Sequence, residues 1–184
     1  MSYAFLIPLL LGFALGGASA FTAAYSHWWG DRGGQAATMI LRNALGIPLW
    51  VVGYILAWRD PAPFLFVPVG AARTLAWLLV AAGTVPVIWG HLQLGLRTHM
   101  PSVRDSLVRT GLYARMRHPI YAGVVLVFGG LAVLRPTAPV LVASCVGIGW
   151  ALVQARLEEL DLVKRLPAYR EYMRQVPRFF PRFR

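Results

Sequence analysis

The sequence predicts an all-α, polytopic integral membrane protein whose helices cross the bilayer about five times. Of its 184 residues, 58% are hydrophobic and only 14% are charged, and the mean hydropathy is +0.58. Most apolar runs are roughly 18 to 22 residues long, which matches the length that a helix needs to cross a bilayer. Strands of a membrane barrel would instead show shorter runs in which apolar and polar residues alternate.

The charged residues predict which side of the membrane each end faces. Eighteen basic against seven acidic residues give a net charge of +11, which in a soluble protein would favour a nucleic-acid partner. Here the basic residues gather in residues 91–118 and in the tail from residue 156, as expected for cytoplasmic segments that face anionic lipids. We therefore expect no nucleic-acid partner, an outside amino terminus and a cytoplasmic helical tail.

The predicted spans follow one another with short connections. Their ranges are 3–24, 37–58, 72–90, 119–134 and 140–154. In the first span, Gly12 and Gly16 form a face on which another helix packs closely. In the second span, Arg42 is expected to extend its side chain to the membrane interface. Residues 25–35 are predicted to form a loop, and the proline-rich residues 59–71 an extended connection.

The last two spans are expected to form an antiparallel hairpin, because only residues 135–139 connect them. The glycines that would let these two helices approach closely are Gly123, Gly129, Gly130, Gly147 and Gly149. After residue 154 the chain is polar and is predicted to carry a helix outside the membrane. The whole chain, 1–184, is predicted to be one membrane domain, with three spans in 1–91 and the loop, hairpin and tail in 92–184.

Residues 111–123 change from a basic, aromatic stretch into an apolar helix. Arg117 and His118 precede Pro119, and proline is favoured at the first helical position because its missing N–H would have no partner there. A helix N-terminus also carries about half a positive charge and attracts anions. We therefore predict that a carboxylate or phosphate binds at this helix start. The remaining histidines occur singly, without the spacing of metal ligands, so no metal site is predicted.

Two neighbouring glutamates follow the last span. Glu159 has Arg156 three residues before it, so a local ion pair accounts for it. Glu158 has no basic residue at helical pairing distance, and an unpaired carboxylate so close to a membrane span is costly. Because the hairpin brings its two ends together, we expect Glu158 to meet Arg117 or Arg115, or the amino group of a ligand. The first is a structural ion pair; the second is half of a site for a zwitterion.

These residues carry a resemblance to the isoprenylcysteine carboxyl methyltransferase family, which is related to the small phospholipid methyltransferases. The shared pattern is Gly-x-Tyr, then Arg-His-Pro-x-Tyr-x-Gly, then Glu-Glu, and finally Tyr-x-x-Tyr-x-x-x-Val-Pro. Its positions here are Gly111, Tyr113, Arg117, His118, Pro119, Tyr121, Gly123, Glu158, Glu159, Tyr169, Tyr172, Val176 and Pro177, followed by Pro181. The resemblance covers residues 107–181, and the first three spans are similar only in hydropathy.

The resemblance implies a membrane enzyme that uses S-adenosylmethionine and releases S-adenosylhomocysteine. The cofactor would bind on the cytoplasmic side, between the last two spans, the preceding loop and the tail. The residues implied for cofactor binding are Tyr113, Arg117, His118, Pro119, Tyr121, Gly123, Glu158, Glu159 and Tyr169. Within this set, Glu158 or Glu159 would bind the ammonium group, and Tyr113 would close over the nucleoside.

The implied acceptor is a lipophilic molecule that enters sideways from the bilayer. A carboxylate acceptor needs no base but needs a cation to position it, for which Arg156 is the candidate. An amine acceptor needs a base, for which Glu159 is the candidate. Carboxyl O-methylation of the isoprenylcysteine type is the first choice, and methylation of a phospholipid or of a small lipophilic amine or thiol is the alternative.

Two other classes stay open at this stage. One is an NADPH-dependent enzyme similar to sterol reductases, and the other is a non-enzymatic membrane protein in which Arg117 and Glu158 join two helices. The short chain resembles the prokaryotic branch of the family, which implies a multi-pass protein of the inner membrane, in contact with membrane lipids, with its active site on the cytoplasmic side.

Overall fold

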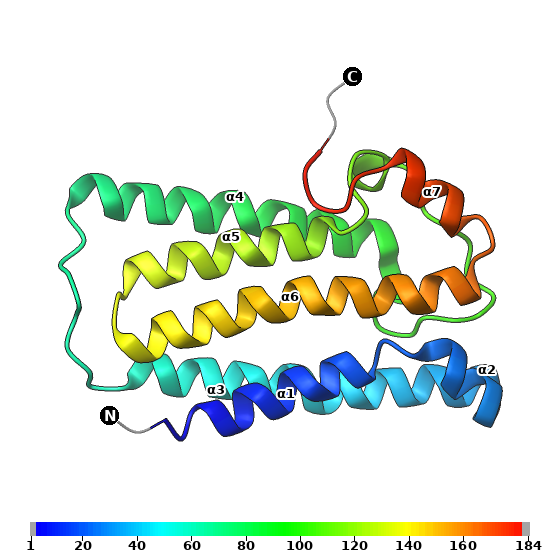
Figure 1. Ribbon diagram of the computed structural model, residues 1–184, viewed down its shortest axis with the longest axis horizontal. Helices are drawn as coiled ribbons and strands as arrows, with labels where there is room; N and C mark the ends of the chain where they lie inside the picture. The colour runs from blue at the N-terminus through cyan, green and yellow to red at the C-terminus, as the bar shows by residue number, and fades with distance from the viewer. Residues whose placement is uncertain (1–2, 182–184) are drawn as a thin grey trace.

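The computed structural model describes residues 3–181 as an elongated bundle of helices (Figure 1). The elements are α1 (Leu6–Ala18), α2 (Thr22–Met39), the π-helix η1 (Ile40–Gly46), α3 (Ile47–Arg59), α4 (Gly70–Leu94), the 3-10 helices η2 (Gly95–Thr98) and η3 (Gly111–Ala114), α5 (Pro119–Leu134), α6 (Ala138–Arg165) and α7 (Tyr169–Gln175). Helix α1 begins at one end of the bundle, and α2 and α7 lie at the other end. The all-α prediction is confirmed: over residues 3–181 the β-type pairing is limited to an isolated bridge between Phe64 and Thr137.

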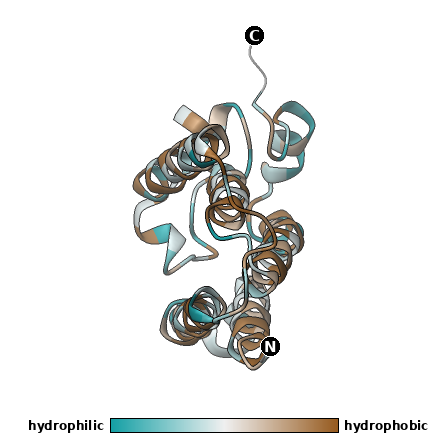
Figure 2. Cartoon of the chain, turned by 90° about the vertical axis from the view of Figure 1, so that its left-hand side faces the viewer, coloured by the Kyte–Doolittle hydropathy of each residue, from teal (hydrophilic) through white to brown (hydrophobic). Residues whose placement is uncertain are grey.

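The helices have the length and composition of membrane spans. Three segments are long and apolar enough to cross a bilayer, namely Thr22–Arg59, Gly70–Thr98 and Ala138–Arg165. The apolar helices α1 and α5 are shorter. Figure 2, which views the bundle from its end, shows hydrophobic residues on every long helix. The chain is therefore a membrane protein, and five crossings remain a prediction.

Glycine lets α1 approach the second span closely, as the sequence predicts. A Cβ atom added to Gly12 would lie 2.6 Å from the carbonyl oxygen of Gly46, and one added to Gly53 would lie 2.6 Å from the backbone nitrogen of Leu9. Both distances are too short for any side chain, so these backbones touch directly. Gly16 packs instead against the indole ring of Trp150 on α6.

The predicted loop 25–35 is wrong in its local structure. These residues belong to α2, which reverses direction at Gly30, where φ is +72°. The Thr22 Oγ1 and Thr38 Oγ1 atoms lie 3.1 Å apart although the residues are sixteen positions apart in the chain. Polar and glycine-rich residues therefore form a turn between two short antiparallel helical pieces, because glycine adopts positive φ without steric cost.

The second span contains a π-helical turn, η1, immediately before α3. Pro48 lies in the first turn of α3, and a proline ring clashes with the carbonyl group four residues earlier, which here is that of Ala44. The wider π-turn relieves this clash, and such turns occur frequently at functional sites. Arg42 lies in η1 and donates to buried Ser19 Oγ inside the bundle, and its expected extension to the membrane interface remains a prediction.

The hairpin of α5 and α6 forms as predicted, but its glycines serve two different contacts. Gly147 on α6 packs against the ring of Phe128 on α5. Gly123 and Gly130 pack instead against the backbone of α4, and Gly129 faces open space, as does Gly149. Helix α6 continues without a break to Arg165, so the segment after residue 154 belongs to the same helix as the last span, and where that span leaves the lipid remains a prediction. The glutamate pair therefore lies on the same rigid helix as the span.

Candidate functional site

The tail returns to the Arg-His-Pro segment and pairs with its backbone. The N–H of Arg117 donates to Pro177 O at 2.9 Å, and the N–H of His118 donates to Arg178 O at 3.0 Å. Pro119 then begins α5 as its first residue. These two backbone hydrogen bonds thus hold the tail against the start of α5, and they place the tail residues beside α6.

A buried ionic cluster fixes this junction, and we call Arg117, His118, Glu159 and Arg178 the Glu159 cluster. The Glu159 side chain is 0% exposed, and its Oε1 atom lies 2.9 Å from Arg117 Nη2 and 3.3 Å from His118 Nε2. Arg178 donates from Nε to Oε1 at 3.0 Å and from Nη2 to Oε2 at 2.6 Å. Hydrogen bonding to Glu159 raises the pKa of the Arg178 guanidinium. A buried carboxylate is stable here because cations surround it.

Each of the three guanidinium nitrogens of Arg117 already has a protein partner. Its Nη1 atom donates to Met173 O at 2.8 Å and to Val176 O at 2.6 Å, while Nε and Nη2 meet Glu159. The expected pair of Arg117 with Glu158 is therefore wrong, since Arg117 pairs with the neighbouring glutamate. Its role as seen in the structure is to join α5, α6 and the tail.

Glu158 has a different environment. Its Oε1 atom accepts a hydrogen bond from Tyr121 Oη at 2.6 Å and one from Gln154 Nε2 at 3.3 Å. Both donors are neutral, so neither compensates the carboxylate charge. Gln154 lies one helical turn before Glu158 on α6, and Tyr121 lies on α5. Tyr121 Oη and Gln154 Nε2 therefore orient a negative charge without neutralising it.

Glu158 lines a cavity of about 550 Å³ in this half of the bundle. This volume lies within the usual range of small-molecule sites, about 300–1,000 Å³. The cavity-lining residues that the sequence predicted are Tyr113, Arg117, His118, Tyr121, Glu158 and Tyr169. The predicted residues outside the lining are Pro119, Gly123, Arg156 and Glu159. The cavity thus collects the aromatic residues of the motif and one of its two glutamates.

The two residues predicted to act in chemistry, Arg156 and Glu159, both lie away from the cavity. The Arg156 side chain is 57% exposed, and its Nη1 atom lies 3.9 Å from Glu159 Oε2. The sequence did not predict several other residues that line the cavity, including Arg42, His91, Trp150 and Gln154. Gln154 had a detectable signal, since it is a polar residue one turn before Glu158 in an apolar helix.

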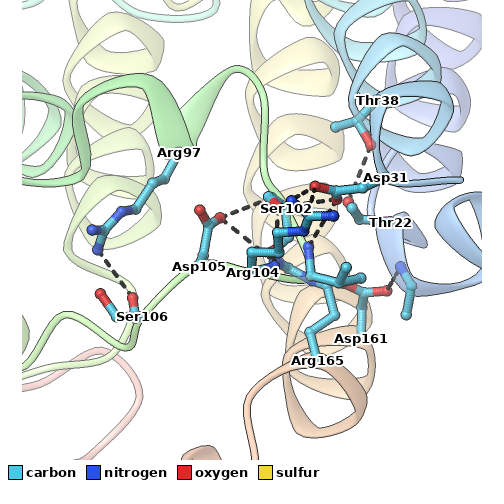
Figure 3. Close-up of polar contacts among 12 residues, drawn as sticks. Thr22, Asp31, Thr38, Arg97, Ser102, Arg104, Asp105, Ser106, Asp161 and Arg165 are labelled. Carbon is cyan, nitrogen blue, oxygen red and sulfur yellow. Dashed lines mark hydrogen bonds and ion pairs between the residues drawn. The ribbon is translucent and has the colours of Figure 1, made fainter.

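The loop between η2 and η3 closes one side of the cavity, which residues 105–108 line. Figure 3 shows how it is held. Ser102 Oγ donates to both carboxylate oxygens of Asp31, at 2.9 and 2.7 Å. Arg165 donates from Nη1 to Ser102 O at 2.8 Å and from Nε to Asp161 Oδ2 at 2.5 Å. Side chains of α2 and α6 therefore fasten the loop over the cavity.

Tyrosines from η3 and α7 complete the wall. Tyr172 Oη donates to Tyr113 O at 2.5 Å and so links α7 to η3. Burial raises the pKa of Tyr172 to about 12. Burial, and then the negative charge of Glu158, raises the pKa of Tyr113. Both phenols therefore stay protonated and neutral at physiological pH.

The cavity residues fit the chemical groups of S-adenosylmethionine. The Glu158 carboxylate, whose hydrogen-bond donors among residues 3–181 are the neutral Tyr121 and Gln154, suits an ammonium group as its counter-ion. The faces of Tyr113, Tyr121 and Trp150, which line the cavity, suit a sulfonium or an adenine ring. Over residues 3–181, no group of three or more His, Cys, Asp or Glu side chains is arranged to hold a metal ion.

The fold and the site define an all-α membrane protein with a cavity that helices α1, η1, α3, α4, α5, α6 and α7 line. A family model described as phospholipid methyltransferase matches residues 71–167, which is more than half of the chain. The chain belongs to the phospholipid methyltransferase family, which is of the same kind as the isoprenylcysteine carboxyl methyltransferases.

Two curated relatives are similar to part of the chain. The cobalt-zinc-cadmium resistance protein CzcN of Cupriavidus metallidurans is 32% identical over 112 residues, which are 59% of this chain and 49% of the relative. The nickel-cobalt-cadmium resistance protein NccN of Alcaligenes xylosoxydans xylosoxydans is 30% identical over 115 residues, 61% of this chain and 51% of the relative. The matches span about half the length of these relatives. No solved structure matches the chain.

Proposed function

We propose that this protein is a membrane methyltransferase that uses S-adenosylmethionine to methylate a lipophilic acceptor. The observation that carries the proposal is the Glu158 carboxylate, which faces a cavity among aromatic rings and has neutral donors as hydrogen-bond partners. The family membership supports a methyltransferase over a reductase or a purely structural protein. A carboxyl group on the acceptor, as in the isoprenylcysteine type, is the first choice.

The chain's own residues would bind, orient and exclude water. When bound, S-adenosylmethionine supplies a methyl group on a positively charged sulfur, and this group passes to the acceptor in an in-line displacement. Glu158 would bind the ammonium group, with Tyr121 and Gln154 holding the carboxylate in place. The fastened loop and the tail would exclude water, so that alignment makes the main contribution to the rate.

An amine acceptor would need a base, and the structure favours His91 over Glu159 for this role. Glu159 does not line the cavity, and its carboxylate already pairs with Arg117 and Arg178. His91 lines the cavity, and its Nδ1 atom lies 2.7 Å from Val87 O. Because a carbonyl oxygen only accepts, Nδ1 carries the proton, and Nε2 of the neutral ring is left as an acceptor. Phospholipid or small-amine methylation is therefore the second candidate.

We also propose where the reaction takes place. The basic connecting segment and the tail both lie at the end of the bundle where α2 and α7 are found (Figure 1), and both contribute residues to the cavity lining. The positive-inside rule supports placing this end in the cytoplasm, which for a prokaryotic protein makes it the inner face of the inner membrane. The acceptor would enter from the lipid between helices.

Ligand titration of the purified protein tests the proposal. S-adenosylhomocysteine and NADPH are added separately, and thermal stability is followed. A ligand at about 100 times its Kd stabilises the folded state by about 2.7 kcal/mol. We expect stabilisation by S-adenosylhomocysteine and none by NADPH. Stabilisation by NADPH alone would favour a reductase, and stabilisation by neither would count against both enzymes. Methylation of a lipid extract with labelled S-adenosylmethionine, followed by mass analysis of the product, would then identify the acceptor.

A further inference from the structure

Arg42 is a charged residue that the proposed cofactor site does not use. It is the sole charged residue of the sequence between Arg32 and Arg59, and it lies in the membrane-length segment Thr22–Arg59. Ionisable residues in such segments face the bundle interior or a cavity and commonly mark functional sites. Arg42 also belongs to the π-helical turn η1, an irregularity that frequently accompanies function.

Arg42 lines the same cavity as Glu158. Its Nε atom donates to Ser19 Oγ at 3.2 Å, and its Nη1 atom donates to Thr98 O at 2.7 Å. Both of these partners are neutral oxygen atoms, which position the cation without compensating its charge. Of the other arginines that line the cavity, Arg117 pairs with Glu159 and Arg165 pairs with Asp161. Arg97 donates to the neutral Ser106 O, but it is exposed, whereas Arg42 is half-buried. Arg42 therefore presents a fixed positive charge to whatever fills the cavity.

The residues that follow Arg42 in the chain form an apolar wall of this cavity. Gly46, Trp50 and Tyr54 succeed it at intervals of four and all line the cavity, because residues four apart lie on one helix face. On α5, the lining residues Val124 and Phe128 are also apolar. Arg42 thus lies where the polar part of the cavity meets its apolar part. We call this apolar part, lined by Gly46, Trp50, Tyr54, Val124 and Phe128, the apolar channel.

This arrangement matches an amphipathic ligand with a negatively charged head. An apolar chain beside Trp50 and Tyr54 would place its head group at Arg42. Glu158 and Arg42 both line this cavity, so two opposite charges border one space. A cation held at Glu158 and an anion held at Arg42 would therefore occupy the same cavity.

We propose that Arg42 binds the anionic head group, a carboxylate or a phosphate, of a lipid-like ligand whose chain lies in the apolar channel. That this ligand is the methyl acceptor rests on the proposed function, whereas the anion site itself does not. A carboxylate at Arg42 would be the reacting group, and Arg42 would take the positioning role that the sequence assigned to Arg156. A phosphate at Arg42 would instead hold a phospholipid whose amine reacts nearby.

The test compares single-chain probes that share a sixteen-carbon chain and differ in the head group, which is a carboxylate, a phosphate or an uncharged hydroxyl. Purified protein in neutral detergent is titrated, without cofactor, with hexadecanoic acid, a hexadecyl lysophosphatidic acid and hexadecanol. Quenching of tryptophan fluorescence reports binding, since Trp50 and Trp150 line the cavity. A charge-assisted hydrogen bond predicts that at least one anion binds about tenfold or more tightly than hexadecanol. Preference for the acid indicates a carboxylate site, and preference for the lysophosphatidic acid indicates a phosphate site.

Two variants separate a binding role from a structural one. Arg42→Gln should reduce the ratio of anion to alcohol affinity to about one, and Arg42→Lys should keep most of it. Equal affinity of the wild type for all three probes would overturn the proposal, and this comparison needs no variant. Loss of S-adenosylhomocysteine binding in Arg42→Gln with an unchanged ratio would also overturn it, since Arg42 would then serve the cofactor. Wild-type selectivity for anions without any S-adenosylhomocysteine binding would support the anion site and count against the proposed function.

Discussion

Glu158 and Glu159 are neighbours in the chain, yet the two regions around them differ in how charge is balanced. In the Glu159 cluster, cations from the segment just before α5 and from the tail surround a carboxylate that is 0% exposed. At the cavity, Glu158 meets the neutral Tyr121 and Gln154. A compensated buried charge holds the fold together, and a charge oriented by neutral groups is available to a ligand. Stability and binding should therefore respond separately to changes at these two residues.

The largest effect is expected from Glu159→Gln, which leaves Arg117 buried without its counter-ion. Breaking a buried ion pair by removing one partner costs about 3–5 kcal/mol. The midpoint of denaturation in detergent should fall sharply. The exposed pair of Glu171 with Arg174 supplies the control, and Glu171→Gln should leave the midpoint almost unchanged. If both variants were equally stable, the Glu159 cluster would not be what holds the tail.

The next effect is expected from Glu158→Gln, in binding rather than in stability. Hydrogen bonds to charged groups contribute about 1.5–3 kcal/mol, so the affinity for S-adenosylhomocysteine should fall about 10–100-fold. Calorimetric titration measures this fall, and the denaturation midpoint without ligand should change little. Glu171→Gln again serves as the matched control. Unchanged affinity would remove Glu158 from the proposed site.

An intermediate case is the loop that Asp31 holds through Ser102 (Figure 3). Its charges are paired, but they fasten a connecting segment instead of two helices. Asp31→Asn should weaken this attachment by about 1 kcal/mol and increase hydrogen exchange at the Ser102 and Val103 amides about fivefold. Helices α5 and α6 should exchange as before. Faster exchange throughout the bundle would show that Asp31 supports the whole fold.

The smallest effect is expected from Arg156→Ala. The side chain is more than half exposed and lies 3.9 Å from Glu159, and exposed pairs contribute about 0–1 kcal/mol. The free energy of unfolding should fall by no more than about 1 kcal/mol, and the rate of methyl transfer should change by no more than about twofold. A selective loss of acceptor methylation would restore the role that the sequence analysis gave to Arg156 and would weaken the case for Arg42.

Much of the fold was predictable because its causes are local. Hydropathy and the length of apolar runs predict helices that cross a membrane, and Gly12 predicts a close helix contact that the structure confirms. The predicted loop at residues 25–35 failed because polar and glycine-rich residues were taken to exclude helix, whereas a single residue, Gly30, makes the reversal. The end of α6 was missed because hydropathy reports where a span leaves the lipid and not where a helix ends.

The sequence by itself determined the class of protein, the family motif and the presence of one glutamate that local pairing did not explain. Only the tertiary structure decided which glutamate faces the cavity, because consecutive residues point about 100° apart on a helix. It also decided that Arg117 belongs to Glu159 and that Arg42, far away in the chain, faces the same cavity as Glu158. Local pairing rules compare residues three or four apart, and these contacts depend on how separate helices pack.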